Sequence, residues 1–392
     1  RYLRIEQYSN SETIKVLRKL ISPHVFMRTF ILRYTIKAVN VMHTHVYPGR
    51  ASHQNKLALS NFWLVLGFIG FMGYLSPPVL GDSEREQTGC ADGVTPECLV
   101  VLALADATRL EATYWKDLAH VAIASAQLEY GDVEGARGNL RRASEHIYSG
   151  GNEFNRAEVL IEMSVVQAEL GDLEAAETNI AKAISVADVI TLPDWRYWAL
   201  SFVPRAKAKT CAFLDAKESI GESLIYVKLI DDIVARASAS THIASAQVEV
   251  GDSKGAMRTV ERILKVVTNL DDEYWKTELL LQVALLQAKV GDVEAADRSI
   301  VEVSAIAEGV EASWRYWRLS QIVLVQAQIG KGLASRGLII DLVNILEVDI
   351  ADESLVGWRT FAFANLSKAL AIVETREGGR VPASLLAARL CA

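Results

Sequence analysis

A two-residue phrase, Gly-Asp, recurs every forty residues and constrains the fold of this chain more than any other feature. It occurs at 131–132, 171–172, 251–252 and 291–292. Cys211-Ala212 stands where another copy would fall, and Gly330-Lys331 comes one residue early. A fixed period of this length is typical of stacked structural repeats, so we expect one elongated repeat body rather than several separate globular domains.

The unit at residues 271–310 shows how one repeat would be built. It begins with three acidic residues, whose carboxylates accept hydrogen bonds from free backbone amides and suit the positive end of a helix dipole. Apolar residues at three- and four-residue spacing then predict a helix that ends near Val290. Gly291 would end this helix in the left-handed conformation, and Asp292 would cap the next one. The phrase therefore predicts a turn between two antiparallel helices.

The same pattern predicts an all-α solenoid of about six to seven helix hairpins over residues 99–392. First helices are expected near 114–130, 154–170, 195–210, 235–250, 274–290, 314–329 and 358–373. Second helices are expected near 133–148, 173–189, 213–229, 253–269, 293–308 and 332–347. Leu99 to Leu110 is predicted as a lone second helix that caps the front of the stack, and Pro382 to Leu390 as a short closing helix.

Two further series keep the forty-residue period. Alanine recurs where a small side chain would let paired helices approach closely, at Ala136, Ala176, Ala216, Ala256 and Ala296. Glutamine recurs one turn before the end of the first helices, at Gln127, Gln167, Gln247, Gln287 and Gln326, with Lys207 in the third unit. We expect the glutamines to hydrogen-bond neighbouring loop backbone, because buried polar groups need partners. Recognition of a peptide backbone is the alternative.

Phrases such as IASAQLEYGDVEGA, VVQAELGDLEAA and LLQAKVGDVEAA resemble the tetratricopeptide-type helical repeats of bacterial proteins, over roughly residues 97–375. The unit is longer than the usual 34 residues of that repeat, and the usual Trp-Leu-Gly-Tyr pattern is not reproduced. The resemblance implies a right-handed α-solenoid that binds peptides or protein segments without catalysis. It transfers no catalytic residues to this sequence.

The N-terminal part of the chain differs sharply from the repeats. Residues 1–56 carry ten Lys/Arg and two Asp/Glu, whereas the rest of the chain carries 31 and 46. A basic segment thus precedes an acidic body, which argues against the repeats being a nucleic-acid groove. Residues 57–75 contain no charged side chain and are long enough to cross a bilayer as a helix.

The segment 57–80 has three interpretations. It is a transmembrane anchor with its basic side in the cytoplasm, or a signal peptide that starts at Met42 and is cleaved near residues 79–81, or a buried core helix. Cleavage would leave residues 1–56 out of the mature protein. The first two interpretations place the repeats outside the cytoplasm, in the periplasm if the protein is bacterial.

Cys90 and Cys98 stand in the linker 81–98, ahead of the first repeat. In an oxidising compartment they could close a small disulfide loop, with ordinary thiols as the alternative. Their spacing matches no zinc motif, so we expect no metal there.

Basic and aromatic residues form a row at the starts of the first helices. The basic positions are Lys116, Arg156, Arg196, Arg236, Lys276, Arg315 and Arg359, and Trp precedes five of them. Trp-Arg-Tyr-Trp occurs twice, at 195–198 and 314–317. Such a row could grip an acidic or aromatic-containing peptide. Alternatively, each cation pairs with acidic residues just before its helix, and Trp fills the seam between repeats.

The third unit breaks the pattern. Pro204 lies inside its first helix, where proline removes a hydrogen bond and kinks the backbone. A bend, a hinge or a ligand notch is expected, with simple decay of the repeat as the alternative. The two Trp-Arg-Tyr-Trp phrases, whose extra aromatic residues break the average pattern, and Lys207 of the irregular unit give the partner-binding candidates: Trp195, Arg196, Tyr197, Trp198, Lys207, Trp314, Arg315, Tyr316 and Trp317.

The sequence contains no phosphate-binding glycine loop, no nucleophile elbow, no HExxH and no histidine spacing typical of a metal site. We therefore expect no cofactor and a non-enzymatic scaffold that binds a protein or peptide on a solenoid outside the cytoplasm. Two alternatives are a ligand-sensing or accessory subunit, with a small-molecule site near the third unit, and a structural assembly subunit.

Overall fold

The computed structural model describes Cys90 and residues 93–110, 114–145, 147, 152–309, 312–348 and 355–378. The chain divides into two compact units, Arg1–Val79 and Leu80–Ala392, and every described residue belongs to the second. The basic segment 1–56, the apolar segment 57–80 and the predicted helix 382–390 lie outside the described residues. In the described part of the chain, no helix is long and apolar enough to cross a membrane.

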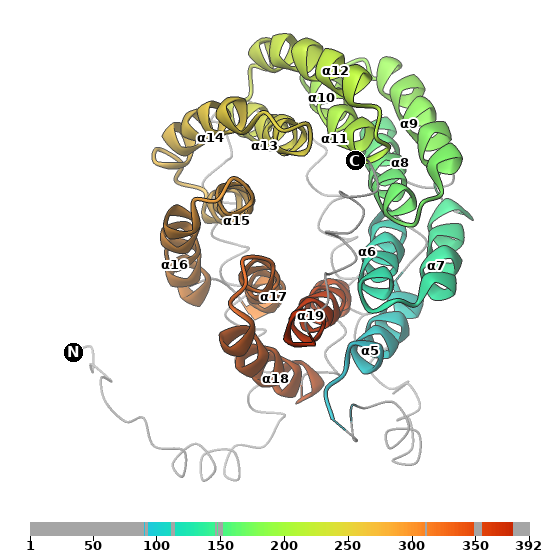
Figure 1. Ribbon diagram of the computed structural model, residues 1–392, viewed down its shortest axis with the longest axis vertical. Helices are drawn as coiled ribbons and strands as arrows, with labels where there is room; N and C mark the ends of the chain where they lie inside the picture. Colours follow the sequence, from blue (N-terminus) through green and yellow to red (C-terminus); the bar gives the residue numbers. More distant parts are fainter. Residues whose placement is uncertain are drawn as a thin grey trace, which may run out of the picture. The chain divides into compact units, whose positions relative to one another are not determined.

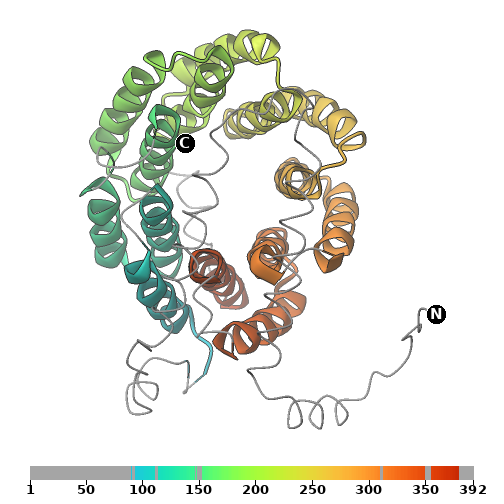
Figure 2. The ribbon, with the colours of Figure 1, turned by 180° about the vertical axis from the view of Figure 1, so that it is seen from behind.

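The helices of this unit form two layers (Figures 1 and 2), which confirms the expected all-α fold. The inner layer holds the first helices: α6 (Tyr114–Tyr130), α8 (Glu153–Glu169), α10 (Pro193–Leu200), α11 (Val203–Lys209), α13 (Ile233–Glu249), α15 (Glu273–Lys289), α17 (Ala312–Gln328) and α19 (Val356–Glu377). The outer layer holds α5 (Pro96–Arg109), α7 (Val133–Glu145), α9 (Leu173–Asp188), α12 (Phe213–Tyr226), α14 (Ser253–Val267), α16 (Val293–Gly309) and α18 (Gly332–Val348). A short 3₁₀ helix, Val227–Leu229, follows α12.

The Gly-Asp turns have the geometry that the sequence predicts. Gly291 has φ +93°, and its amide donates to the carbonyl of Ala288 at 3.0 Å. The amide of Asp292 donates to the carbonyl of Gln287 at 2.8 Å, which completes a Schellman motif. The carboxylate of Asp292 then accepts from the amide of Ala295 at 3.0 Å and caps α16. In the third unit Cys211 takes the glycine position with φ +63°.

The recurring alanines lie where outer and inner helices of a hairpin meet. All five have a fully buried side chain, with 0% exposure at Ala136, Ala176, Ala216, Ala256 and Ala296. A larger side chain at these positions would push the paired helices apart, since protein cores are close-packed.

The predicted kink in the third unit is a complete interruption. The helix expected at 195–210 divides into α10 and α11, with Ser201 and Phe202 between them. Pro204 stands in the first turn of α11, where its missing amide hydrogen costs nothing. The break turns Phe202 inward, and its ring lies 4.3 Å from that of His242 on α13.

The prediction that α5 caps the front of an open stack is wrong, because α5 pairs with α19, the last described helix. Arg359 Nε lies 2.6 Å from Asp106 Oδ2, and Arg359 Nη2 lies 2.7 Å from Asp106 Oδ1, with both side chains buried. Ser367 Oγ donates to the carbonyl of Pro96 at 2.8 Å. Apolar side chains of α5, α6, α18 and α19 share one core. The inner layer therefore closes into a ring within the unit Leu80–Ala392, with α19 beside α6 (Figure 1).

Candidate ligand-binding chambers

The inner layer encloses two adjoining chambers. One, of about 1010 Å³, is lined mainly by residues from the first turns of the inner helices, and we call it the aromatic chamber. The other, of about 710 Å³, is lined by residues nearer the ends of the same helices, and we call it the charged chamber. Both chambers are lined by Glu158, Glu162, Arg205 and His242. The two chambers therefore adjoin along these side chains.

Eleven aromatic side chains line the aromatic chamber: Tyr114, Trp115, Phe154, Trp195, Trp198, Phe202, Tyr274, Trp275, Trp317, Trp358 and Phe361. Many of these rings touch across helix boundaries. The ring centroids of Phe154 and Trp198 lie 4.8 Å apart, and those of Trp317 and Trp358 lie 5.0 Å apart. Trp115 on α6 lies 6.3 Å from Trp358 on α19, across the closure of the ring. The rings form a wall that extends over several repeats.

Three aspartates at helix starts also line the aromatic chamber. Asp232 accepts from the amide of Ala235 at 2.7 Å and caps α13, and Asp272 accepts from the amide of Trp275 at 3.0 Å and caps α15. Asp194 accepts from the amides of residues 231 and 232 at 3.2 Å. These hydrogen bonds fix the three carboxylates at the chamber.

Glu158 stands between the two chambers and carries a shifted pKa. The phenol of Tyr114 donates to Glu158 Oε2 at 2.6 Å, joining α6 to α8. Burial raises the pKa of Glu158 to about 7; the bond from Tyr114 opposes this shift, and the charges of Glu162 and Glu278 add to it. Burial also raises the pKa of Tyr114. Glu158 therefore changes charge near neutral pH.

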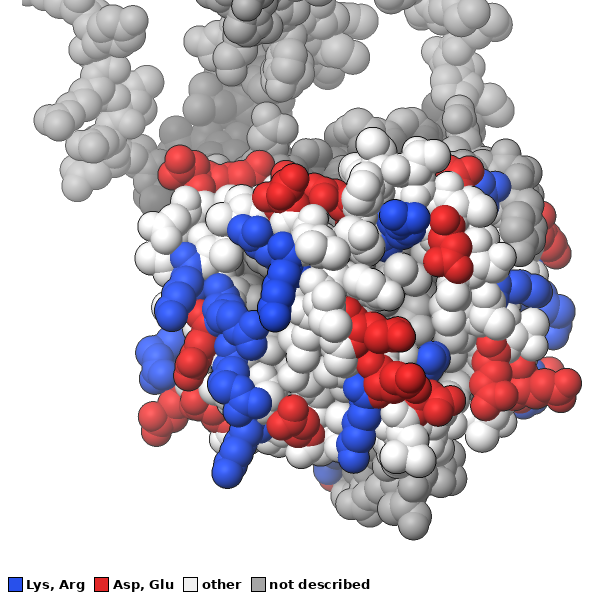
Figure 3. Space-filling model, turned by 90° about the horizontal axis from the view of Figure 1, so that it is seen from above, with Lys and Arg blue, Asp and Glu red and all other residues white. Residues whose placement is uncertain are grey.

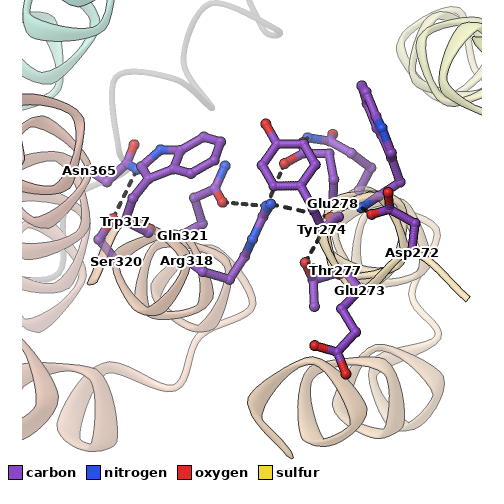
Figure 4. Close-up of polar contacts among 12 residues, drawn as sticks. Asp272, Glu273, Tyr274, Thr277, Glu278, Trp317, Arg318, Ser320, Gln321 and Asn365 are labelled. Carbon is purple, nitrogen blue, oxygen red and sulfur yellow. Dashed lines mark hydrogen bonds and ion pairs between the residues drawn. The ribbon is translucent and has the colours of Figure 1, made fainter. Parts of the chain in front are cut away.

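Arg318 is fully buried in the wall between α15 and α17 (Figure 4). Its guanidinium forms an ion pair with Glu278 and donates to Gln321 Oε1 at 2.7 Å. Its central carbon lies 4.7 Å from the ring centroid of Trp317 and 5.2 Å from that of Tyr274. The guanidinium of Arg318 is thus held by two aromatic ring faces and by the carboxylate of Glu278.

In the charged chamber, cations and carboxylates neutralise one another. Lys209 lies 3.3 Å from Glu169 and 3.5 Å from Glu249, and Lys289 lies 3.0 Å from Glu249. Burial alone would raise the pKa of Glu249, but Lys289 and Lys209 outweigh it and lower that pKa to about 2. Burial, with a smaller contribution from Arg205, lowers the pKa of His242 to about 3, so this imidazole is neutral.

Three of the predicted partner-binding residues, Trp195, Trp198 and Trp317, line the aromatic chamber. Others of the nine have different surroundings. Tyr197 stacks on Tyr226 of α12 with 5.2 Å between ring centroids.

Arg196 lies over the ring of Tyr197 at 5.6 Å. Lys207 donates to Ser219 Oγ at 2.8 Å, within its own hairpin. Tyr316 packs against the core shared by α5 and α19. The side chain of Trp314 is not among those that the structure describes. Arg315 is half-buried on α17.

The glutamine series bonds to the paired helix rather than to loop backbone. The side-chain oxygen of Gln287 accepts from Ser299 Oγ at 2.9 Å, and that of Gln247 accepts from Thr259 Oγ1 at 3.0 Å. Equivalent bonds join residues twelve apart in three more hairpins: Gln127 with Asn139, Gln167 with Asn179, and Lys207 with Ser219. Gln326 is the exception, because its side-chain oxygen is buried with no hydrogen-bond partner among the described residues. The polar series at 139, 179, 219, 259 and 299 also has the forty-residue period, and this signal was missed.

The basic row at the helix starts is mostly engaged in local contacts. Arg156 pairs with Glu153 at 2.6 Å, and Lys276 pairs with Glu302 at 3.4 Å. Lys116 and Arg236 donate to backbone carbonyls just before their helices, at 2.9 and 3.1 Å. Of these four contacts, only that of Arg156 is with an acidic residue at the start of its own helix, as the second interpretation expected. Four of the preceding tryptophans, however, line the aromatic chamber: Trp115, Trp195, Trp275 and Trp358.

Cys90 and Cys98 form a disulfide. Cys98 lies in the first turn of α5, and Cys90 lies eight residues earlier in the chain, so the bond ties the linker to this helix. Within the described ranges, no group of three or more His, Cys, Asp or Glu residues is placed to hold a metal ion.

Comparisons with known proteins give little further information. No protein-family model and no curated protein matches the chain. Among solved structures, it resembles a Rap protein crystallised in complex with competence and sporulation factor, with 14% sequence identity and a TM-score of 0.38. The match covers 74% of this chain and 78% of the other. Similarity at this level carries no conclusion about function.

Proposed function

We propose that this protein is a non-enzymatic binding protein whose ring interior takes up a peptide or an extended protein segment. The observation that carries the proposal is the pair of adjoining aromatic and charged chambers, of about 1010 and 710 Å³. Pockets rich in aromatic side chains with a few fixed polar groups are typical ligand sites. Two adjoining chambers lined by successive turns of the same helices suit an extended ligand better than a compact one.

A selection experiment tests this function. The ring is immobilised and used to select from a phage-displayed library of random twelve-residue peptides, and the affinity of the enriched peptides is measured by calorimetry. We expect Trp198→Ala and Trp317→Ala each to weaken binding at least tenfold, because both remove a ring from the chamber wall. Tyr197→Ala is the matched control, since Tyr197 belongs to the same Trp-Arg-Tyr-Trp phrase but stacks on Tyr226.

The proposal fails if no peptide is enriched, or if enriched peptides bind the two Trp variants as tightly as the unchanged protein. Circular dichroism of each variant separates loss of binding from loss of fold.

A small-molecule site near the third unit is the second candidate. The break between α10 and α11 is the observation that favours it, because this break brings Phe202 to the chamber beside Trp195 and Trp198. Lys207, expected in such a site, is instead bonded to Ser219. Native mass spectrometry of the purified protein tests this candidate, since a retained small ligand would add a discrete mass that Trp198→Ala removes.

We also propose that the ring works outside the cytoplasm. The apolar residues 57–75 and the Cys90–Cys98 disulfide support this location, because disulfides persist in oxidising compartments. Cell fractionation with N-terminal sequencing distinguishes an anchored protein from one with a cleaved signal peptide. Recovery in the cytosol with Cys90 and Cys98 as free thiols would contradict both.

A further inference from the structure

We propose that the aromatic chamber binds the positively charged side chain of an arginine or lysine in a peptide segment. This inference rests on the proposed peptide-binding function and adds the chemistry that the chamber would select. The sequence suggested a ligand of the opposite charge, because a row of basic residues stands at the starts of the first helices. In the structure, basic side chains of that row such as Lys116 and Arg236 bond to nearby backbone carbonyls. The aromatic chamber is lined instead by several carboxylates.

The charges that line the aromatic chamber are strongly unbalanced. Six carboxylates line it, of which Glu162 pairs with Arg205 and Glu278 pairs with the buried Arg318. Burial raises the pKa of a third, Glu158, to about 7, so three aspartates carry most of the excess negative charge. Among the described residues, Asp194, Asp232 and Asp272 form no ion pair, and their carboxylates accept hydrogen bonds from backbone amides. A helix dipole offsets only about half a charge at each helix start. The chamber therefore attracts cations.

The aromatic wall adds a second attraction for the same ligand. An ammonium or guanidinium over the face of a Trp or Tyr ring is stabilised by the negative charge of the ring face, and more strongly where water is excluded. The wall already binds one cation in this way, because Arg318 lies over Trp317 and Tyr274 and pairs with Glu278 (Figure 4). An incoming basic side chain would meet aromatic rings and carboxylates together in the lining of the chamber.

This imbalance is a property of the aromatic chamber. In the charged chamber, Lys209 and Lys289 pair with Glu169 and Glu249. On the outer face seen in Figure 3, basic and acidic side chains are interspersed. The aromatic chamber is also larger than a lone ammonium group needs, and it adjoins the charged chamber. These dimensions favour a basic side chain carried on a peptide over a free small ammonium compound.

The first test uses the tightest peptide from the library selection. It is compared with a version in which citrulline replaces each arginine and norleucine replaces each lysine, by titration of the intrinsic tryptophan fluorescence. We expect the neutral version to bind at least tenfold more weakly, and 0.5 M NaCl to weaken only the basic peptide. Equal affinity of the two versions would overturn the inference while leaving peptide binding in place. Enrichment of no peptide would instead remove the proposed function.

The second test removes charge without removing helix caps. Asparagine caps helices as well as aspartate does, so Asp194→Asn, Asp232→Asn and Asp272→Asn combined should keep the fold and weaken the basic peptide about tenfold. The matched control is Asp252→Asn with Asp292→Asn, two capping residues outside the chambers, which should leave the affinity unchanged. Equal loss in both variants would overturn the inference. The inference would also be overturned if the protein bound tetramethylammonium chloride at the chamber but did not bind the basic peptide.

Discussion

At the scale of single residues, Glu158 makes the stability of the protein depend on pH near neutrality. Burial raises its pKa from an ordinary value near 4.5 to about 7. The folded state therefore binds a proton more tightly than the unfolded chain does, and the free energy of unfolding falls as pH rises from about 4.5 to 7. A shift of this size corresponds to at most about 3 kcal/mol.

The variant Glu158→Gln tests this dependence. Its amide oxygen still accepts the hydrogen bond from Tyr114, but the side chain no longer titrates. We expect urea unfolding to show the unchanged protein losing about 1 to 3 kcal/mol relative to this variant between pH 5 and pH 8. Glu174→Gln, at an exposed position on α9, is the control and should follow the unchanged protein. Parallel pH profiles for Glu158→Gln and the unchanged protein would contradict the assignment.

The buried bond between Gln287 and Ser299 supports a second residue-scale prediction. Both side chains are buried, so removing one partner leaves the other unsatisfied. We expect Ser299→Ala to lower the free energy of unfolding by about 1 to 3 kcal/mol. In a double-mutant cycle, the cost of Ser299→Ala should be smaller in a Gln287→Leu background. Strict additivity of the two changes would mean that the bond contributes nothing.

At the scale of helices and turns, the sequence predicts most of the architecture because each turn is encoded locally. Gly291 has φ +93°, a conformation that costs an L-amino acid about 1 to 2 kcal/mol. Asp292 caps the helix that follows. Such requirements are confined to a few consecutive residues, so their period is visible in the sequence. The glutamine bonds were misassigned because their partners lie twelve residues away on another helix.

Two glycine-to-alanine changes of opposite effect test this local encoding. A Cβ at Gly291 meets no atom within 4 Å, so Gly291→Ala isolates the backbone cost and should destabilise the protein by about 1 kcal/mol. Gly221 lies inside α12, and a Cβ there is equally free of contacts. Because alanine suits a helix better than glycine, Gly221→Ala should stabilise by about 0.5 to 1 kcal/mol. Shifts of the same sign in urea midpoints would contradict the explanation.

In the third unit, the repeat pattern predicts where the first helix should lie but not that it divides into α10 and α11. Pro204 predicted a kink, and the structure places it in the first turn of a new helix, α11. Whether a proline bends a helix or starts another depends on the packing of neighbouring helices, which the local sequence does not contain. The inward turn of Phe202 and its contact with His242 follow from that packing. The candidate site was accordingly predicted only in part, through Trp195, Trp198 and Trp317.

At the scale of the whole described unit, ring closure was beyond the reach of the repeat pattern. A repeat specifies how each hairpin meets its neighbour, whereas closure depends on the small rotation accumulated over all hairpins. One buried residue pair joins the two ends of the ring. Arg359 is the last member of the basic row, and it pairs with Asp106 on α5, at the other end of the repeat array. The sequence predicts that α5 lacks a first helix of its own, but it does not show that α19 packs against α5.

Closure predicts that the two ends of the described repeat array lose stability together. Arg359→Met leaves Asp106 buried with only Arg109 as a partner, 3.3 Å away and a third exposed, and should cost about 3 kcal/mol. Hydrogen exchange should then speed up in α5, α6 and α19 at once, although α5 and α19 are far apart in the sequence. Adding Asp106→Leu removes the unpaired charge and should recover most of the loss.

The matched control is Asp172→Asn, which breaks the exposed pair with Arg137 between neighbouring hairpins. An exposed ion pair contributes less than about 1 kcal/mol, so exchange should change little and only locally. If Arg359→Met quickens exchange in α19 but leaves α5 and α6 unchanged, the helices do not act as one closed ring. An open array unfolds from its ends, whereas a closed ring has no free end until the contact between α5 and α19 is broken.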